Sequence, residues 1–315
     1  MRVLRREERT GCPVLLSLWS AEKDHRSKKQ NIQHSKLEPL IQGVVYRYRT
    51  IEIHPFHELL ISAITVRIPR KEDYVVTLDL ASFDSIRHAA AEINARVAKL
   101  DVLINNAGIM GLEKYTLTRD GLEAQFGANH IGHFLFTNLI MPKIIAAGPG
   151  ARVVNLSSNG HWLGDWRGED YNFHDGQAYD PWAAYGQSKT ASILFAKSLV
   201  AKLGAKGVLA YSLHPGMIQT NLGNDVDLGV WPGVFAMFAA RGYPVDENLT
   251  RFKTLPQGVA TTLTAALSPE IVKHSGAYLV DCNISGNVAR HATDMDRAEA
   301  LWKESEKIVG ESFAY

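Results

Sequence analysis

The chain has 315 residues, 46% of them hydrophobic and 21% charged, which suits one large α/β domain with a substantial core. Its formal net charge of +1 gives no argument for binding to nucleic acid or to an anionic membrane. Cys12 and Cys282 lie far apart and the twelve histidines lack metal-ligand spacing, so we expect neither a disulfide framework nor a metal site.

No stretch of the sequence reaches the run of about eighteen apolar residues that a membrane-spanning helix needs. Residues 13–19 are apolar and follow four arginines, but no small-residue cleavage site of a signal peptide comes after them. Residues 228–240 are also apolar, yet Pro232 and Gly233 interrupt them, which favours a lid over an apolar pocket. We therefore expect a cytoplasmic protein without a membrane segment.

The first 74 residues differ in composition from the rest. They carry fourteen Lys and Arg against nine Asp and Glu, contain only Gly11 and Gly43, and show little periodicity. From residue 75 onward, strand-like and helix-like patterns alternate. We predict a degenerate or misassembled first βαβ unit in residues 1–74 and a complete α/β unit in residues 75–315.

This alternation predicts a single domain of the α/β class, built on a doubly wound parallel sheet of the Rossmann type. The sequence does not assign the first two strands of that sheet. The expected strands are residues 74–78, 102–105, 152–156, 208–213 and 277–281. The expected helices are residues 83–99, 121–146, 183–203, 256–267 and 294–309.

Polar or glycine-rich residues follow three of the expected strands. Open α/β sheets build their sites at the carboxyl ends of parallel strands, so we expect these groups to meet. They are Asn105-Asn106-Ala107-Gly108, Ser157-Ser158 and His214-Pro215-Gly216.

Tyr185 and Lys189 lie four apart on an expected helix, the spacing that stacks two side chains on one face. An ammonium beside a phenol stabilises the phenolate and would bring its pKa down from about 10 toward neutral. Tyr185 would then exchange a proton readily. The pair alone is weak evidence, because it can also be two residues on a solvated helix face.

With these motifs in this order, the chain resembles the short-chain dehydrogenase/reductase family, most closely its retinol-dehydrogenase-like and WW-domain-oxidoreductase-like branch. The resemblance covers roughly residues 75–310 and makes residues 75–315 the catalytic domain. The segments that carry it are Asp79-Leu80-Ala81-Ser82, the N-N-A-G run, Asn129-His-Ile-Gly-His-Phe, Ser157-Ser158, the Tyr185 and Lys189 pair, and residues 214–220.

The resemblance implies roles for the catalytic residues. Tyr185 would be the general acid and base, Lys189 would lower its pKa and hold the nicotinamide ribose, and Ser158 would polarise the carbonyl. Asn129 would anchor a water that relays protons to Lys189; packing of its amide within the helix is the structural alternative. Ser157 would instead cap the end of its strand.

The resemblance also implies a nicotinamide cofactor, NADP(H) in preference to NAD, although the deciding residues lie in the N-terminal segment. Asp79 would meet the adenine edge, and capping of the following helix is compatible with that role. Asn105 would tie neighbouring strands together. The residues expected to contact the cofactor, besides Tyr185 and Lys189, are Asp79, Asn106, Gly108, Ile218 and Thr220.

The glycine-rich loop of the family is missing. Its first strand ends in T-G-x-x-x-G-x-G, whose backbone approaches the cofactor pyrophosphate at a helix N-terminus. Thr10-Gly11 could be a remnant, but Leu15 and Ser17 stand where further glycines belong. Three explanations stay open: a misassembled N-terminus, a chain that has lost cofactor binding, and binding through an unfamiliar loop. The change in composition near residue 74 favours the first.

Residues 221–255 are expected to form a lid over the substrate. Their apolar side chains favour a hydrophobic carbonyl or alcohol, but the same side chains could pack on the body of the domain. They are Trp231, Phe235, Met237, Phe238 and Tyr243.

The sequence thus predicts an NADP(H)-dependent oxidoreductase that moves hydride between nicotinamide and a small hydrophobic ketone, aldehyde or secondary alcohol. A role in secondary metabolism and a homo-oligomer paired through the long helices are further expectations from the resemblance. A catalytically silent Rossmann-like binding or regulatory protein is the alternative from another class. An epimerase or dehydratase would share the Y-x-x-x-K pair, but the N-N-A-G run and Pro215-Gly216 argue against it.

Overall fold

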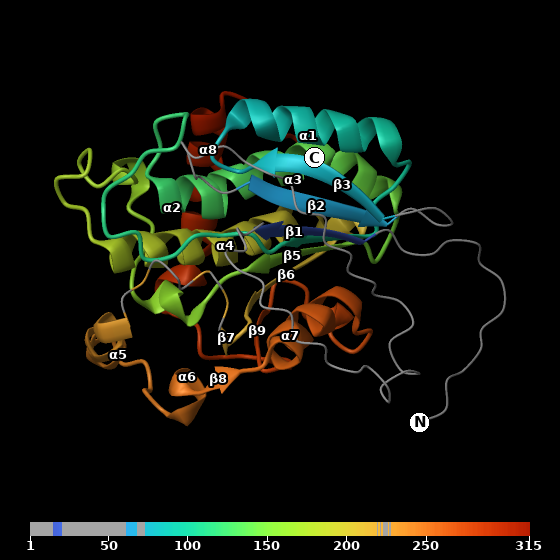
Figure 1. Cartoon of the computed structure of the whole chain (residues 1–315). Coiled ribbons are helices and arrows are strands. Elements are labelled where there is room, and N and C mark those ends of the chain that lie inside the picture. Colours follow the sequence, from blue (N-terminus) through green and yellow to red (C-terminus); the bar gives the residue numbers. More distant parts are fainter. Residues whose placement is uncertain are drawn as a thin grey trace, which may run out of the picture.

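The computed structural model describes residues 73–218, 220, 222, 226 and 228–315, together with the backbone of two strands at residues 15–20 and 61–67. A sheet of eight strands lies at its centre, in the order β10-β9-β6-β5-β4-β1-β2-β3 (Figure 1). The strands are β1 Leu15–Ser20, β2 Ile61–Arg67, β3 Asp73–Asp79, β4 Val102–Asn105, β5 Arg152–Leu156, β6 Leu209–His214, β9 Tyr278–Val280 and β10 Asn283–Ile284.

The sheet is parallel through its centre and antiparallel near both edges. β1, β4, β5, β6 and β9 pair in parallel, whereas β2 runs antiparallel to β1 and to β3, and β10 runs antiparallel to β9. The link from Arg67 to Asp73 is too short for the crossover of about a dozen residues that a parallel neighbour needs. The predicted α/β class is therefore confirmed, and the sheet is mostly rather than wholly parallel.

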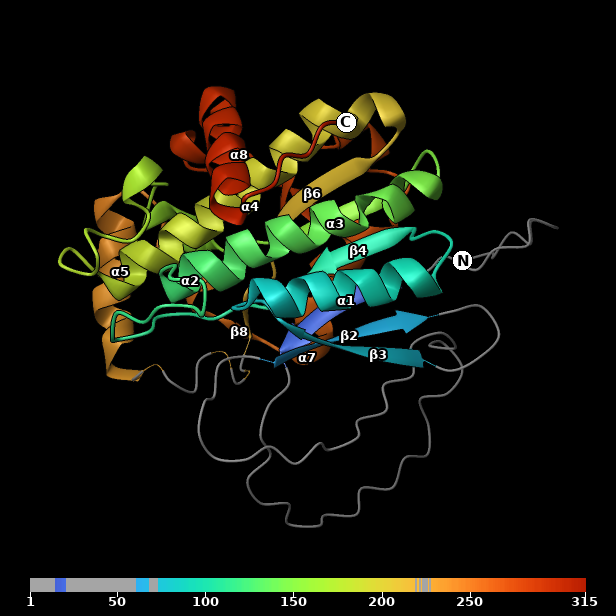
Figure 2. The same ribbon diagram turned by 90° about the horizontal axis from the view of Figure 1, so that it is seen from above.

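Helices cover the sheet in two layers (Figures 1 and 2). α1, α3, α4 and α8 lie over one face and share a large apolar core, while α7 packs on the other face around a smaller one. The helices are α1 Phe83–Arg96, α2 Ala124–Phe126, α3 Gly132–Ala146, α4 Pro181–Leu203, α5 Trp231–Ala240, α6 Glu247–Thr250, α7 Leu255–Leu267 and α8 Met295–Val309. Short 3₁₀ turns lie at Asn159–Trp162, Gly168–Asp170, Gly204–Lys206, Leu228–Val230, Val272–His274 and Arg290–Ala292, and β7 Met217–Ile218 pairs with β8 Phe252–Lys253.

The expected helix of residues 121–146 begins later and is not uniform. Glu123 accepts hydrogen bonds from the backbone N–H groups of Gln125 and Phe126, so it starts α2 at Ala124. A π-helical turn, η1 Gly127–Ile131, then separates α2 from α3. Such turns insert an extra residue and often mark functional positions, and this one carries Asn129.

α5 forms where an apolar lid was expected. Pro232 lies in its first turn, where the N–H that proline lacks would have no helical partner. α5 lies beside the beginning of α4 (Figure 1), and the rings of Trp231 and Trp182 are 5.7 Å apart.

The C-terminal helix α8 covers the long helices. It crosses α4 (Figure 2), and the ring of Trp302 packs edge-on against Phe134 of α3 at 4.9 Å. Beyond α8, the hydroxyl of Tyr315 donates to Asn138 Oδ1 at 2.7 Å. The chain's own C-terminus therefore occupies the outer surface of α3 and α4.

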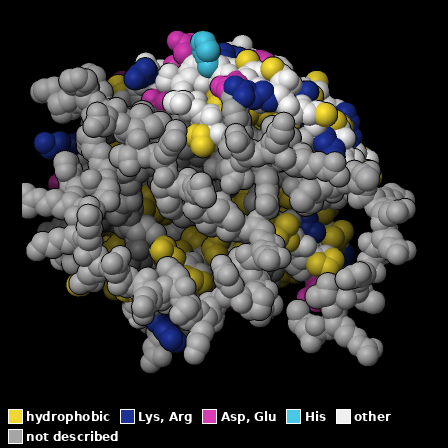
Figure 3. Space-filling view, turned by 45° about the vertical axis from the view of Figure 1, so that its right-hand side comes forward, with side chains coloured by type: hydrophobic (Ala, Val, Ile, Leu, Met, Phe, Trp, Pro, Cys, Tyr) yellow, Lys and Arg dark blue, Asp and Glu magenta, His cyan; other side chains and the backbone are white. Residues whose placement is uncertain are grey.

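Within the described residues, none of the helices combines the length and the apolar character needed to traverse a bilayer. On the face shown in Figure 3, the described residues present Lys, Arg, Asp and Glu side chains together, with hydrophobic side chains between them. Charges of the two signs are mixed in this view, so no single sign dominates it.

Candidate active site

Three strand ends and one helix build the candidate site. The N-N-A-G run follows β4, Ser157 and Ser158 follow β5, and Pro215 follows β6. Because β4, β5 and β6 are parallel neighbours, these residues lie together at the carboxyl-terminal ends of the central strands. α4 begins at Pro181, where the Asp180 side chain accepts from the N–H of Ala183, and it carries Tyr185 and Lys189 along those strand ends.

Burial governs the two principal titrating groups. Tyr185 and Lys189 are each 5% exposed. Burial raises the pKa of Tyr185 to about 12, against a smaller lowering effect of the neighbouring Ser158. Burial also lowers the pKa of the Lys189 ammonium to about 8. Each group is thus shifted toward its neutral form.

In the protein without cofactor, the predicted lowering of the Tyr185 pKa by Lys189 is therefore wrong. The Lys189 ammonium lies over the Tyr185 ring, 5.5 Å from its centroid, and donates to the carbonyl oxygen of Leu156 at 3.1 Å. Desolvation of the phenolate outweighs any stabilisation from a cation in that position.

The two serines have different surroundings, as expected. The Ser157 hydroxyl donates to the carbonyl oxygen of Lys189 at 2.7 Å and so ties the end of β5 to α4. Ser158 Oγ accepts from the N–H of Gly160 at 3.0 Å, and Ser158 lies close enough to Tyr185 to lower the pKa of its phenol. A Cβ at Gly160 would lie 2.6 Å from the Tyr185 ring, so only glycine fits beside that ring without a shift.

The Asn129 side chain is held by hydrogen bonds. Its amide group donates to the carbonyl oxygen of Ile109 and to Ser188 Oγ, each at 2.9 Å, and its Oδ1 accepts from the N–H of Ile109 at 2.8 Å. Both amide hydrogens are used, so this group cannot donate to a water as well. Oδ1 accepts one bond and has a second lone pair to which a water could donate, so the expected water relay through Asn129 stays a prediction.

Asn105 ties strands together, as predicted. Its amide donates to Asn155 Oδ1 on β5 and to Thr137 Oγ1 on α3, each at 2.9 Å. Asn106 is only partly buried, so it faces the open side of the sheet edge. Gly108 packs against Asn129 and Lys189. A Cβ at this position would be 2.9 Å from Asn129 Oδ1 and 3.4 Å from the Lys189 ammonium.

The other expected cofactor residues lie farther along the same edge. Asp79 ends β3 and its Oδ1 accepts from the N–H of Ala81 at 2.9 Å, while Ser82 provides the N-cap of α1. Asp79 therefore stabilises the turn before the helix rather than capping the helix. Ile218 lies on β7 against Gly258, and Thr220 is exposed.

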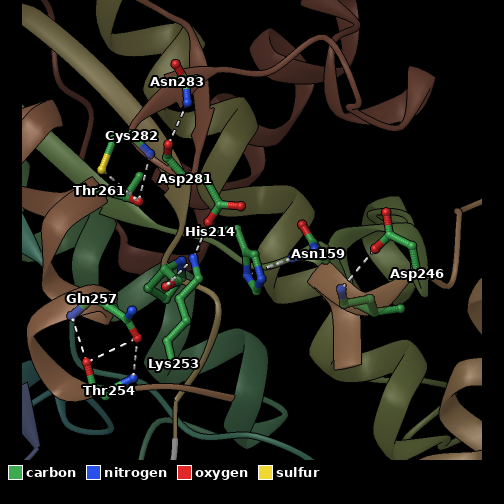
Figure 4. A network of polar contacts seen from close by, with 12 residues as sticks. Asn159, His214, Asp246, Lys253, Thr254, Gln257, Thr261, Asp281, Cys282 and Asn283 are labelled. Carbon is green, nitrogen blue, oxygen red and sulfur yellow. Dashed lines mark hydrogen bonds and ion pairs between the residues drawn. The ribbon is translucent and has the colours of Figure 1, made fainter. Parts of the chain in front are cut away.

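Several polar residues behind Ser158 were missed by the sequence reasoning (Figure 4). The N–H of Asn159 donates to His214 Nδ1 at 3.3 Å, and the His161 ring lies 2.7 Å from the carbonyl oxygen of Ser158. Lys253 is ion-paired with Asp281 and reaches toward the Pro215 carbonyl. His214 was expected here as part of its motif, and His161 lies close to the Ser157-Ser158 motif and could have been suspected. Lys253 arrives only through the pairing of β7 with β8.

The apolar lid residues divide into two groups. Phe238 and Tyr243 are buried and pack with Leu163 on the body of the domain. Trp231 is partly exposed and joins Trp182, whose ring meets that of Tyr185 edge-on at 6.3 Å. Trp182 thus links the catalytic tyrosine to α5, and sequence reasoning did not single it out.

The residues fit the nicotinamide-ribose half of a dinucleotide. Lys189 is a buried ammonium whose only hydrogen-bond acceptor among the described residues is one carbonyl, so it has donors to spare for ribose hydroxyls. The family's glycine-rich loop follows the first strand. Thr10 and Gly11 precede β1 and lie outside the described residues, whereas Leu15 and Ser17 are part of β1. None of these four residues comes after β1, and the sequence between β1 and β2 contains a single glycine, Gly43.

Comparison with known proteins gives a consistent answer. A family model described as "Enoyl-(Acyl carrier protein) reductase" matches residues 58–230. The short-chain dehydrogenase TIC 32 A, chloroplastic, of Brassica napus is 38% identical over 239 residues, which are 74% of this chain and 71% of that protein. Retinol dehydrogenase 13 of Homo sapiens is 40% identical over 233 residues, 74% of this chain and 67% of that protein.

The chain belongs to the short-chain dehydrogenase/reductase family. A crystal structure of an uncharacterised protein from Mycobacterium paratuberculosis has the same fold, with 35% sequence identity, a TM-score of 0.54 and coverage of 76% of each chain. The predicted family is confirmed, including its retinol-dehydrogenase-like relatives. The enzyme is an oxidoreductase that acts on CH–OH groups, and its family uses NAD(P).

Proposed function

We propose that this enzyme uses NADP(H) to reduce a hydrophobic ketone or aldehyde, and in reverse to oxidise the corresponding alcohol. The observation that carries the proposal is the position of Ser158 beside Tyr185, where it lowers the phenol's pKa, with the Lys189 ammonium over the tyrosine ring. This places a hydroxyl pair and a cation where a carbonyl oxygen could be polarised and protonated.

The proton chemistry follows from the pKa values. Bound nicotinamide would supply the hydride for reduction and accept it in oxidation. With a pKa near 12, Tyr185 keeps its proton at neutral pH and is ready to donate it to the oxygen of a carbonyl under reduction. The Gly160 N–H donates to Ser158 Oγ, which leaves the serine hydrogen for Tyr185 or for the carbonyl oxygen. The protonated phenol is the form that the reduction would use, and the phenolate is the form that the oxidation would use.

The cofactor would be held by the residues that face the carboxyl ends of β4 and β6. Lys189 would donate to the nicotinamide ribose, Gly108 leaves room for close approach of the backbone, and Asn106 would border the adenosine ribose. Ile218 and Thr220 would contact the nicotinamide half, and Asp79 the adenine edge. NADP in preference to NAD is part of the proposal.

A hydrophobic substrate is supported by the aromatic side chains beside Tyr185. Trp182 adjoins the tyrosine, and Trp231 extends the aromatic surface onto α5. Five relatives are named retinol dehydrogenases, and that name is consistent with an apolar alcohol here as well. A role in secondary metabolism, a cytoplasmic location and a homo-oligomer remain predictions from the sequence.

The test uses the purified full-length protein. NADPH and NADH are titrated by fluorescence, and oxidation of NADPH is then followed with decanal and with a polycyclic ketone as substrates. We expect saturable binding, tighter for NADPH, and turnover of at least one of the two carbonyl compounds. A saturable preference for NADH would refute the choice of NADP.

A catalytically silent binding protein is the second candidate, and one observation favours it: the sequence between β1 and β2 contains a single glycine, Gly43. The same titration separates the two functions. Cooperative thermal unfolding without saturable binding of either dinucleotide would identify the silent protein and exclude the reductase.

A further inference from the structure

A small closed cavity lies directly behind the candidate site, between β4, β5 and the helices α3 and α4. It offers about 10 Å³ to the centre of a water-sized sphere, which is room for one water molecule. Six of its seven lining residues have polar side chains, and every lining side chain but that of Asn129 belongs to no part of the proposed mechanism. They are Asn105, Asn129, His130, His133, Asn155, Ser192 and Phe195.

The hydrogen-bond partner of His133 fixes its tautomer. His133 Nε2 lies 2.9 Å from the carbonyl oxygen of Ala107, which can only accept, so Nε2 carries the hydrogen. Burial lowers the pKa of His133 to about 4, an effect that the nearby Lys189 charge reinforces, so the ring is neutral near pH 7. Nδ1 is then a bare acceptor, and no protein group reaches it.

Two further buried acceptors, on His130 and Asn105, also lack a hydrogen-bond donor. The Ser305 hydroxyl donates to the Leu301 carbonyl at 2.7 Å, so His130 Nε2 must donate to Ser305 Oγ and His130 Nδ1 is an acceptor. Asn105 Oδ1, which cannot donate, also lacks a protein partner. A buried acceptor without a donor costs about 1–3 kcal/mol, so three in one place call for a donor from outside the chain.

We propose that this cavity binds one structural water molecule and that His133, held by it, is a positioning residue for the cofactor loop Asn106-Ala107-Gly108. The water donates to His133 Nδ1 and to Asn105 Oδ1. It accepts from the amide of Asn155, which uses one of its two N–H groups on the Ser192 carbonyl at 3.2 Å. Each of its contacts then matches an available donor or acceptor.

The two nitrogens of the His133 ring connect the water to the loop that borders the active site. One nitrogen is fixed by the water, and the other holds the Ala107 carbonyl, one residue before Gly108. Gly108 packs against Asn129 and the Lys189 ammonium. A rotation of the His133 ring would therefore move the loop that borders the cofactor. This part of the inference rests on the proposed function, whereas the water and the tautomer do not.

The water and the tautomer are tested on the unsubstituted full-length protein without cofactor. A high-resolution crystal structure should show one ordered water within hydrogen-bond distance of His133 Nδ1 and Asn105 Oδ1. Spectra of the ¹⁵N-histidine-labelled protein should show His133 protonated on Nε2 and hydrogen-bonded at Nδ1. A dry cavity, or a proton on Nδ1, would overturn the proposal even if the enzyme binds NADPH.

The positioning role is tested with two substitutions that separate the ring nitrogens. His133→Gln keeps an N–H near the position of Nε2, whereas His133→Asn keeps a polar atom near Nδ1 and loses the bond to Ala107. We expect His133→Asn to raise the KM for NADPH about threefold to tenfold, the loss of one net hydrogen bond, with a smaller change in kcat. His133→Gln should stay within about twofold of the unsubstituted enzyme.

His130→Asn is the matched control, since it makes the same change in the same cavity wall without touching the cofactor loop. Its KM for NADPH should not change. An equal rise in KM for His130→Asn and His133→Asn would reduce His133 to a packing role and refute positioning. If NADPH fails to bind the unsubstituted protein, the proposed function falls, and the crystal and NMR results still decide on the water.

Discussion

Burial, more than charge pairing, sets the protonation states of the residues around Tyr185. Tyr185 is held neutral by desolvation, and the Lys189 ammonium is brought within reach of neutrality by the same effect. A neutral phenol beside Ser158 is a ready acid for the oxygen of a ketone or aldehyde. The tyrosine and lysine spacing identifies the group, but its burial decides which protonation state is present.

Removal of the Tyr185 hydroxyl should abolish proton transfer while leaving cofactor contacts in place. We expect Tyr185→Phe to lower turnover by at least about a hundredfold with little change in the Kd for NADPH. Tyr211→Phe is the control, because the hydroxyl of Tyr211 donates to the Ile271 carbonyl in the core on the opposite face of the sheet. Steady-state kinetics and fluorescence titration measure both quantities. Unchanged turnover in Tyr185→Phe would remove the residue from the mechanism.

Among the helices, the region from α2 to α3 shows how local hydrogen bonds decide an element. Glu123 is fully buried and both of its carboxylate oxygens accept from backbone N–H groups at the start of α2. The π-helical turn that follows places Asn129 against Ile109, and so fixes the loop after β4. An irregular helix start therefore positions the catalytic edge of the sheet.

Glu123 gives a pH-dependent contribution to stability. Burial raises its pKa from 4.5 to about 7, so its contribution is fully present below pH 4.5 and is lost as the pH rises through 7. We compare the free energies of unfolding of Glu123→Gln and of the unsubstituted protein. As the pH rises from 4.5 to 8, we expect the difference between them to shift in favour of Glu123→Gln by on the order of 3 kcal/mol. Urea unfolding of both proteins at several pH values measures the difference. A difference that does not vary with pH would mean that Glu123 titrates normally.

The helix α8 is anchored by one large aromatic residue. Trp302 is 3% exposed and packs against Phe134 and Phe195, with the Lys202 ammonium 4.8 Å from the centroid of its ring. We expect Trp302→Ala to lower the free energy of unfolding by about 3–5 kcal/mol, as other Trp-to-Ala changes in cores do. Chemical denaturation measures this loss. Phe313→Ala, at a partly buried position on the same cluster, should cost less; an equal cost would show that α8 is not anchored chiefly by Trp302.

For the whole molecule, the C-terminal cover on α3 and α4 bears on assembly. Relatives in the family were expected to pair through the long helices, but α8 and the residues after it lie over that surface here. A homo-oligomer paired through the long helices stays a prediction, and α8 would lie next to such an interface. The antiparallel strand β2 is likewise a property of the whole sheet, because the short link to β3 leaves no room for a crossover.

Acid sensitivity is a property of the whole fold as well. Among the residues that the structure describes, four histidines are buried neutral, and burial lowers their pKa values: those of His130 and His214 to about 3, and those of His133 and His161 to about 4. Their contribution to stability is present above pH 6.5 and is lost as the pH falls toward those values, by roughly 1.4 kcal/mol per histidine and pH unit.

We therefore expect the free energy of unfolding to fall steeply between pH 6.5 and 5. Glu123 acts in the opposite direction over part of this range, but one carboxyl cannot offset four imidazoles. Urea unfolding at pH 7.5, 6.5 and 5.5 measures the slope. Equal stability at the three values would show that the histidines are accessible to protons in the folded protein.

The sequence by itself determined the family, the order of strands and helices from residue 75 onward, and most of the candidate site. These follow from local patterns: strand ends that carry polar residues, and a tyrosine and lysine spaced for one helix face. Ser158 was preferred to Ser157 because of the resemblance to the family, and the structure brings it to Tyr185. Asn105 was correctly expected to join two strands.

Only the tertiary structure decided how those residues are charged, aimed and supported. The pKa of Tyr185, the engaged amide of Asn129, the turn at Asp79 and the arrival of Lys253 beside Pro215 all depend on neighbours distant in sequence. Desolvation and hydrogen-bond partners are set by packing in three dimensions, and neither leaves a periodic signal along the chain.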